Sequence, residues 1–225
     1  MVLVFPSSAD QQIVIAGEQF HLLPERAVYW PRQDVVIVTD LHLGKTTPAR
    51  GAAATVPVDT SIADLERLDR VVRRTSVRQL LILGDLLHAR SGDWTEAAAV
   101  FAQWRASRPS LAITLIRGNH DRLTGDPPEN WRIRCVDEPL AQAPLAFCHY
   151  PPVENAGYAI AGHLHPAVVL AGPGRQRLRF SCFWFGRKQA LLPAFNENAS
   201  ASVIRLQPGD RVFVIDGEAV LAVQR

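Results

Sequence analysis

Residues 35–45 read VVIVTDLHLGK, and the fold prediction begins with this stretch. Its first four residues are consecutive β-branched apolar side chains, the pattern of a strand buried on both faces of a parallel sheet. Asp40 and His42 follow where that strand ends. In open α/β sheets, ligands bind at the carboxyl ends of strands, so both side chains are expected at a binding edge. Taken alone, the pair also fits a turn-capping aspartate beside a surface histidine.

The composition is that of an ordinary globular protein. The 225 residues suffice for one domain, assigned here to 1–225, and 48% hydrophobic residues can form a sizeable core. A net charge of +2 argues neither for nor against a nucleic-acid partner. The cations are nearly all arginine, since only Lys45 and Lys188 are lysines. Arginine suits bidentate phosphate contacts, but a GC-rich coding sequence gives the same bias.

The cysteines and the hydropathy pattern indicate the cellular location to expect for the protein. Cys135, Cys148 and Cys182 are odd in number and contain no C-x-x-C pair, which fits a reducing compartment better than a disulfide framework. The N-terminus lacks a basic segment followed by an apolar one, and no apolar run approaches the roughly 18 residues needed to span a bilayer. We therefore expect a soluble, cytoplasmic protein without a membrane partner.

Strands and helices alternate in the first half of the chain. Short alternating segments predict a hairpin over 12–23 and a strand over 27–30. An apolar stripe predicts a helix over 59–74, with Asp59 or Thr60 as N-cap, and a second helix is expected over 94–106. Buried strands are expected over 79–83 and 111–116, and residues 45–57 are expected to form a loop beside the site.

The pattern changes after Trp131, where strands dominate. They are expected over 131–136, 144–148, 158–161, 167–171, 178–185, 202–206 and 211–215, separated by turns that contain Gly and Pro. Strand–helix alternation followed by strands predicts an α/β fold in which two sheets pack face to face with helices outside.

Polar residues follow five of these strands in the same way. Six of the seven histidines lie at strand ends, together with Asp40, Asp85 and Asn119. One histidine at a strand end is common by chance, but six are not. The five segments are Asp40-Leu41-His42, Gly84-Asp85-Leu86-Leu87-His88, Gly118-Asn119-His120-Asp121, Cys148-His149 and Gly162-His163-Leu164-His165.

These side chains form a coherent ligand set. Carboxylate, imidazole and amide donors without a thiolate suit borderline and hard divalent ions. The ligands are too many for one tetrahedral ion, so the sequence predicts two divalent metal ions, with Mn²⁺ first and Fe, Zn or Mg as alternatives. The glycines before Asp85, Asn119 and His163 let the backbone turn sharply and approach the metals closely.

The ordered set D-x-H, G-D-x-x-H, G-N-H-D, H and G-H-x-H resembles the calcineurin-like metallophosphoesterases over residues 40–165. The resemblance implies a single-domain, four-layer α/β/β/α sandwich with a dinuclear site. By position, it implies that His120 is the catalytic residue outside the ligand set and that Asp85 bridges the two metals. It assigns the first metal to Asp40, His42 and His165, and the second to Asn119, His149 and His163.

A narrower resemblance links the motifs at 40–45, 83–88 and 162–166 to the bacterial ligase-associated DNA-damage-response metallophosphoesterases (PdeM-like). It implies a phosphodiesterase, expected to be a DNA endonuclease in a repair context that uses a metal-bridging hydroxide. The alternative is hydrolysis of a small nucleotide or lipid-linked phosphodiester or pyrophosphate. Association with a DNA ligase or helicase follows from the resemblance alone. A third hypothesis is a non-enzymatic scaffold, but such proteins usually lose a ligand or the catalytic histidine.

The sequence allows more than one role for several residues near the motifs. Asp121 could orient His120 or cap a helix. His88 occupies the position where phosphoprotein phosphatases continue with an aspartate, so it could touch substrate, support a ligand or be structural. Arg90 and Arg122 could hold a substrate phosphate or be solvated.

A modest basic patch lies downstream of the motifs, on Arg175, Arg177, Arg179, Arg187 and Lys188. Alternation places the three odd-numbered arginines at 175–179 on one strand face. There they could follow a phosphate backbone, or form a solvated face.

Overall fold

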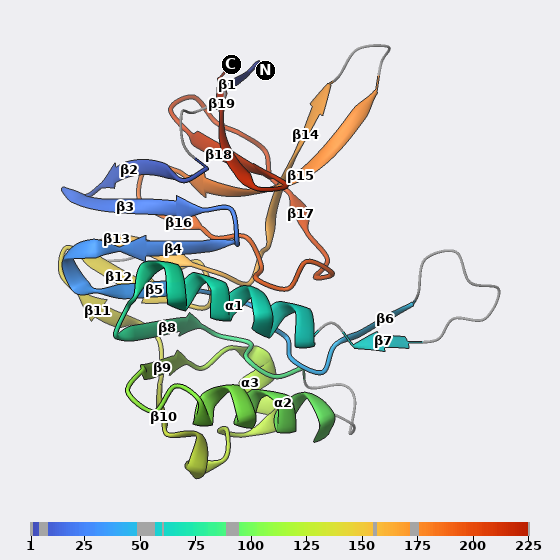
Figure 1. The fold of residues 1–225 in the computed structure, drawn as a ribbon. Helices are drawn as coiled ribbons and strands as arrows, with labels where there is room; N and C mark the ends of the chain where they lie inside the picture. The colour runs from blue at the N-terminus through green and yellow to red at the C-terminus, as the bar shows by residue number, and fades with distance from the viewer. Residues whose placement is uncertain are drawn as a thin grey trace.

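The computed structural model describes residues 2–4, 9–48, 57–59, 61–88, 95–154, 157–171 and 176–224. Its strands form two large sheets and one small hairpin (Figure 1). The α/β class and the two sheets agree with the sequence prediction. In the described part of the chain, no helix is both long and apolar enough to cross a membrane.

The first sheet has seven strands in the order β10-β9-β8-β5-β4-β3-β2. Strands β5, β8, β9 and β10 run parallel, and the other three are antiparallel. Their bounds are Gln11–Ile15 for β2, Glu18–Leu23 for β3, Ala27–Trp30 for β4, Val35–Val38 for β5, Gln79–Leu83 for β8, Ala112–Ile116 for β9 and Ile133–Val136 for β10. All four residues of β5 are buried, as expected for a central parallel strand.

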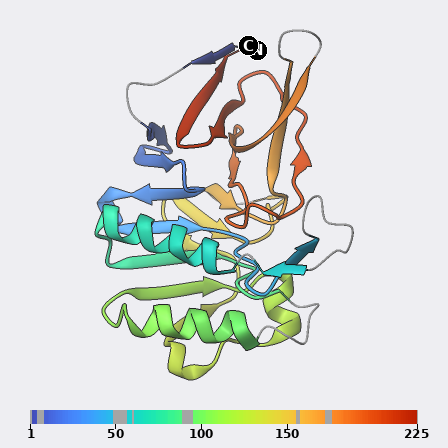
Figure 2. The same cartoon turned by 45° about the vertical axis from the view of Figure 1, so that its right-hand side comes forward.

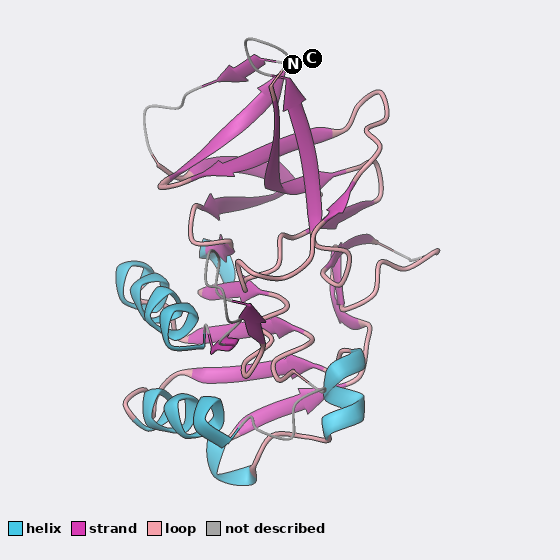
Figure 3. Ribbon diagram, turned by 90° about the vertical axis from the view of Figure 1, so that its right-hand side faces the viewer, coloured by secondary structure: helices cyan, strands magenta, loops and turns pink. Residues whose placement is uncertain are grey.

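Helices α1 (Ser61–Thr75) and α2 (Thr95–Ala106) cover one face of this sheet (Figure 3). Leu68 and Val71 of α1 pack against Val36 of β5 in one buried cluster. Helix α1 begins two residues later than predicted, because Asp59 belongs to strand β7; Thr60 lies outside the described residues. A short helix, α3 (Asn119–Thr124), was not predicted. Two 3₁₀ turns, Pro31–Gln33 and Glu129–Trp131, complete the helical segments of the described residues.

The second sheet has the order β1-β19-β18-β15-β16-β13-β12-β11, and β14 and β17 extend it beside β15. Strands β12, β13 and β16 are parallel neighbours. The bounds are Val2–Val4 for β1, Leu140–Gln142 for β11, Leu145–Cys148 for β12, Tyr158–Ala161 for β13, Pro166–Ala171 for β14, Arg177–Phe185 for β15, Gln189–Leu191 for β16, Ser202–Val203 for β17, Arg211–Asp216 for β18 and Ala219–Gln224 for β19. Strands β1, β11, β16 and β19 were not predicted, and β17 ends earlier than expected. Because β1 pairs with β19, the two termini meet (Figure 2).

A shared apolar core joins the two sheets. Ile37 of β5 and Leu83 of β8 lie in one buried cluster with Phe147 of β12 and Phe183 of β15. The side chains that alternate with these face outward on the second sheet, where Cys182 and Val214 pack with Val168 of β14. Helices were expected outside the two packed sheets, and α1 and α2 lie outside the first sheet. In the described residues, strand β14 packs on the outer face of the second sheet.

Residues 45–57 were expected to be a loop. The structure instead pairs β6 (Thr46–Pro48) with β7 (Pro57–Asp59) as an antiparallel hairpin, and the residues between them lie outside the described part. The hairpin projects from the edge at which β5 and β8 end (Figure 1).

Candidate metal centre

All five predicted motifs meet at one edge of the two packed sheets. Strands β5, β8 and β9 are parallel neighbours in the first sheet, so the residues that follow them share an edge. Strands β12 and β13 are parallel neighbours in the second sheet and bring His149 and the 163–165 segment to the same place. The site is therefore assembled half from each sheet, as the ligand-binding rule for open α/β sheets predicts.

The loops at this edge have an unusual backbone. Asp40, His42, Asp85, His163 and His165 have φ values of 55°, 46°, 55°, 65° and 45°. Residues other than glycine adopt this left-handed region at a cost of order 1–3 kcal/mol, and such residues concentrate at functional sites. The ligand candidates are thus held in conformations that the surrounding fold must enforce.

Hydrogen bonds between neighbouring loops enforce these conformations. The amide of His42 donates to the carbonyl of Asp85 at 2.9 Å, and the amide of Leu43 donates to that of Leu86 at 2.9 Å. The amide of His88 then donates back to Leu43 at 2.9 Å. The loops after β5 and β8 thus continue side by side beyond their strands, which fixes Asp40 and Asp85 relative to each other.

The first group of converging ligand atoms belongs to Asp40, His42 and His165, whose nearest donor atoms lie within 4.8 Å of one another. Asp40 Oδ1 is 3.1 Å from Nε2 of His165 and 3.8 Å from Nε2 of His42. The other oxygen, Oδ2, accepts hydrogen bonds from Thr39 Oγ1 at 2.7 Å and from the amide of His163 at 3.0 Å. One carboxylate oxygen is thereby anchored and the other faces the two imidazoles.

The second group belongs to Asp85, His149 and His163. Nε2 of His149 is 3.6 Å from Asp85 Oδ1, 3.2 Å from Nδ1 of His163 and 3.0 Å from the side-chain oxygen of Asn119. The family resemblance assigned Asn119, His149 and His163 to the second metal; the structure brings these three side chains together, and the assignment to a metal stays a prediction.

Asp85 lies between the two groups. Its Oδ2 is 3.8 Å from Nε2 of His42 in the first group, while Oδ1 faces His149 in the second. The amide of His120 donates to Oδ1 at 2.9 Å, which holds the carboxylate in this orientation. The position is the one that a bridging ligand requires.

The electrostatics of the centre favour a cation. Burial lowers the pKa of His42 to about 3, so its ring is neutral and has a free lone pair. Burial, reinforced by the charge of Asp40, raises the pKa of Asp85 to about 7. Burial also opposes the charge on Asp40, but the hydrogen bond and charges of the surrounding histidines, His165 first, outweigh it and lower the pKa of that carboxyl. Two neighbouring carboxylates beside the neutral ring of His42 suit a divalent cation.

The hydrogen-bonding state of the ligand atoms also fits metal ions. His42 Nδ1 is buried and has no hydrogen-bond partner among the described residues, whereas Asp40 Oδ1 faces Nε2 of His165 at 3.1 Å. Nδ1 of His149 lies 2.9 Å from the carbonyl of Leu83, and its Nε2 faces the centre, 3.0 Å from the side-chain oxygen of Asn119. Nδ1 of His165 donates to the carbonyl of Ser200 at 2.6 Å. Metal-binding histidines typically make this second contact.

His120 and Asp121 have different surroundings. The ring of His120 is part-exposed, its Nε2 is 4.0 Å from Asp85 Oδ2, and burial lowers its pKa. The carboxylate of Asp121 is buried and accepts from the amides of Gly118, Asp85 and Leu86 at 2.9, 2.7 and 3.0 Å. Of the two roles considered for Asp121, these contacts favour the capping and positioning role, since they support the loop that carries Asp85.

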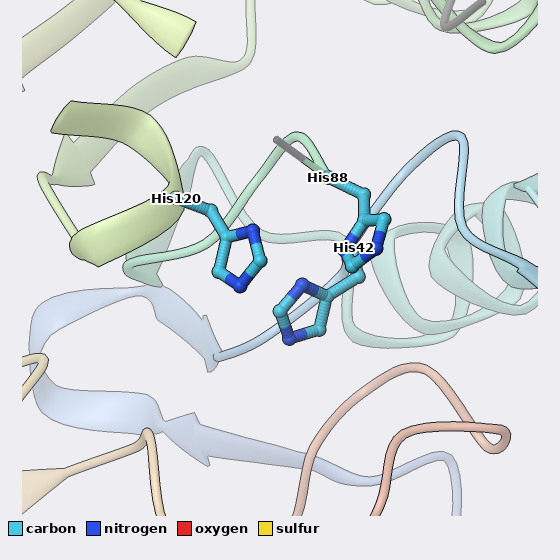
Figure 4. A group of neighbouring side chains, drawn as sticks. All are labelled: His42, His88 and His120. Atoms are coloured by element: carbon cyan, nitrogen blue, oxygen red, sulfur yellow. The ribbon is translucent and has the colours of Figure 1, made fainter. Parts of the chain in front are cut away.

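His88 is close to the site. Figure 4 shows its ring beside those of His42 and His120, and the rings of His88 and His120 stack with centroids 4.9 Å apart. The three rings offer nitrogen atoms within 4.8 Å of one another. His88 is thus adjacent to the candidate catalytic histidine, which fits contact with substrate or support of a ligand.

The structure describes the surroundings of only one of the two candidate phosphate-binding arginines. Arg122 forms an ion pair with Asp137 at 3.1 Å, so its guanidinium already has an acidic partner. Arg90 lies outside the described residues.

The sequence analysis missed two residues that hold the centre together. Glu138 accepts from the amides of His149 and Tyr150 at 2.8 and 2.9 Å and so fixes the loop after β12. The half-exposed ring of Tyr150 packs on that of His163, with centroids 4.3 Å apart. Tyr150 follows His149 directly and could have been considered. Glu138 has no local pattern that marks it, because only the fold brings it to His149.

Comparison with known proteins agrees with this geometry. The family model described as calcineurin-like phosphoesterase matches residues 34–164. The chain is similar to the solved structure of Pseudomonas putida nuclease MPE, at 36% sequence identity and a TM-score of 0.82, covering 95% of this chain and 100% of that one. A distant likeness to Yfce, a phosphoesterase from E. coli, has 13% identity and a TM-score of 0.41, covering 81% and 88% of the two chains. A search of curated proteins gave no match.

The family model spans more than half of the chain, and it includes the first strand-end motif through the first histidine of the last one. The nuclease similarity extends over nearly the whole chain. The centre described above contains clusters of histidine and aspartate that fit two divalent metals. The chain therefore belongs to the calcineurin-like phosphoesterase family, and it is a metal-dependent phosphoesterase.

Proposed function

We propose that this protein is a dinuclear-metal-dependent phosphodiesterase that cleaves DNA as an endonuclease. The observation that carries the proposal is the position of Asp85 between two ligand groups, with His120 beside it at the exposed side of the centre. The overall similarity to Pseudomonas putida nuclease MPE supports a nucleic acid as the substrate, and the motif resemblance described above supports DNA.

The metal ions, when bound, would supply positive charge for the phosphate oxygens and activate the attacking water. Asp40, His42 and His165 would hold one ion, and Asn119, His149 and His163 the other, with Asp85 shared. The oxygen and nitrogen donor set without a thiolate supports Mn²⁺ as the physiological metal.

The chain's own residues account for the remaining chemistry. His120 lies within reach of the centre, and its imidazole can donate a proton to the leaving oxygen as charge develops there. Asp121 and Glu138 keep the ligand loops in place through backbone hydrogen bonds. His88, stacked on His120, is placed to contact the substrate phosphate.

A repair context and association with a DNA ligase or helicase are part of the proposal, supported by the motif resemblance described above. A cytoplasmic location is supported by three cysteines that form no disulfide.

The test is cleavage of end-labelled single-stranded, duplex and nicked DNA by the Mn²⁺-loaded protein, with the Asp85→Asn variant as the blank. Internal cleavage that disappears in the variant is the expected result. Hydrolysis of a generic aryl phosphodiester without any cleavage of DNA would overturn the DNA assignment and identify a small phosphodiester as the substrate.

A further inference from the structure

A β-hairpin rises directly from the metal centre. We call it the β14 arm; it consists of Pro166–Ala171 and the first part of β15, Arg177–Ser181, which pair antiparallel. Pro166 follows the ligand candidate His165 without an intervening residue. Figures 1 and 2 show the arm running from the edge at which the motifs meet toward the end of the molecule at which the chain termini lie.

The two faces of the β14 arm differ in chemistry. Val168 and Leu170 are buried in an apolar cluster with β18 and β19, and this contact fixes the arm to the rest of the sheet. Arg177 and Arg179 lie on the opposite face, because they pair with Ala171 and Val169, which alternate with the buried residues. Both arginines are exposed.

The arginine face lacks compensating acidic groups. Neither Arg177 nor Arg179 has an ion-pair partner among the residues that the structure describes. Most arginines of the first sheet and its helices do have one, as Arg74, Arg117 and Arg122 illustrate. Between Glu154 and Glu197 the sequence contains no Asp or Glu at all. The charge of the arm is therefore available to an anionic partner.

The spacing along the arm suits a nucleic-acid backbone. Arg179 and Arg177 lie opposite Val169 and Ala171, which are four and six residues after His165. At about 3.3 Å per strand residue, these positions are roughly 13 and 20 Å from His165. The two arginines are two residues apart on one face, about 6.6 Å, which is close to twice the 3.4 Å charge spacing of a B-DNA strand. A strand whose scissile phosphate lies at the metals could thus place every second phosphate along this face against one of the two arginines.

We propose that the β14 arm binds the phosphate backbone of the DNA substrate beside the cleavage point, with Arg177 and Arg179 each neutralising one phosphate. This proposal rests on the proposed DNA-cleaving function, and it adds a location for the DNA on the surface of the protein. The arm contributes to substrate affinity and not to the chemical step.

The test compares two double variants that remove the same charge. Arg177→Gln/Arg179→Gln changes the arm; Arg132→Gln/Arg134→Gln is the matched control, since both of its arginines are exposed and lie at or beside β10, the edge strand of the other sheet. For each Mn²⁺-loaded protein, KM and kcat on single-stranded and duplex DNA are measured from low to physiological salt. Hydrolysis of bis(p-nitrophenyl) phosphate serves as a measure of the intact metal centre.

The arm variant is expected to raise KM for DNA about tenfold or more with little change in kcat, and to leave hydrolysis of the aryl diester at the wild-type rate. The slope of log affinity against log salt should fall by about 1.4–1.8, since each of the two phosphate contacts contributes about 0.7–0.9. DNA cleavage by the wild type with no difference between the arm and control variants would overturn the arm alone. A wild type that hydrolyses the aryl diester but neither binds nor cleaves DNA would overturn both proposals.

Discussion

Asp85 is the residue on which both ligand groups depend. One of its oxygens faces His42 and the other faces His149, so its carboxylate lies between the imidazoles of the two groups. A shared carboxylate keeps two divalent ions close enough to act on one phosphate. Loss of this carboxylate should therefore weaken the binding of both metal ions.

We expect Asp85→Asn to abolish phosphodiester hydrolysis and to lower the metal content below two ions per chain. The amide keeps the size of the side chain but loses the charge that two cations share. Metal content by elemental analysis and turnover of an aryl diester are the measurements. Asp137→Asn, at an exposed carboxylate outside the centre, is the control. Full metal content in Asp85→Asn would contradict the bridging role.

His120 is expected to act on the substrate without holding a metal. Its replacement by alanine should lower kcat by about two to four powers of ten, typical for loss of an acid–base group, with metal content nearly unchanged. His21→Ala, on β3 and packed against Tyr29, controls for removal of a histidine elsewhere. Turnover close to wild type would remove His120 from the mechanism, and loss of a metal ion would make it a ligand.

At the scale of elements, the loops at the strand ends depend on close backbone approach. A Cβ added to Gly84 would lie 2.2 Å from Nδ1 of His149 and 2.9 Å from Cα of Gly118. The turn after β8 can therefore pack against the two neighbouring loops only if residue 84 has no side chain. Gly84 also has a φ of +81°, which other residues rarely adopt.

Gly84→Ala is expected to destabilise the fold by about 3 kcal/mol or more and to impair metal binding, because strain and overpacking add. Gly209→Ala is the matched control: it has a φ of +92° but nothing within 4 Å of the added Cβ. It should cost only the backbone strain, about 1–2 kcal/mol. Denaturant unfolding of both variants measures the difference. Equal losses would show that close packing at Gly84 contributes nothing.

Asp121 connects the loop after β8 to helix α3. Its carboxylate accepts from three backbone amides, two of them in the loop that carries Asp85. We expect Asp121→Asn to lower the free energy of unfolding by roughly 2–3 kcal/mol, since buried amides lose acceptors. Metal affinity should fall while kcat at saturating Mn²⁺ stays within about tenfold of wild type. A hundredfold loss of kcat in the metal-saturated variant would instead indicate a direct part in catalysis.

At the scale of the whole molecule, the metal centre joins the two sheets. Asp40 and Asp85 extend from the first sheet, and His149, His163 and His165 from the second. Metal ions held between the two sheets bind the folded chain, because unfolding separates the residues that hold them. Metal binding should therefore stabilise the packing of the sheets, in addition to the apolar core.

Free Mn²⁺ at about 100 times its dissociation constant should stabilise the fold by about 2.7 kcal/mol, which corresponds to roughly 5–10 °C in Tm for a chain of this size. Thermal unfolding with and without Mn²⁺ measures this shift. His163→Ala should lose most of it, whereas His21→Ala should retain it. A shift that survives in His163→Ala would mean that the ions stabilise the protein from another site.

The sequence alone determined the ligand set and the strands that present it. Consecutive apolar residues such as Val35–Val38, followed by Asp40 and His42, are local patterns, and the strands that precede the motifs were predicted nearly to the residue. The physical reason is that a run of apolar residues and the polar residue that follows it are neighbours in the sequence, so both can be recognised without knowledge of distant contacts. The family resemblance added the assignment of these residues to two metal ions, which stays a prediction; the structure brings the same histidines and aspartates together in clusters that fit divalent metals.

Only the tertiary structure decided what depends on distant contacts. Glu138 reaches the amide of His149, and Asp121 reaches that of Asp85, through pairings that no local pattern encodes. The strand cover on the second sheet and the projecting β14 arm likewise follow from which strands pair, such as β14 with both β15 and β17. Strand pairing joins residues far apart in the chain and depends on the packing of the whole core, so local patterns predicted the candidate ligands, whereas the fold determined which residues support them.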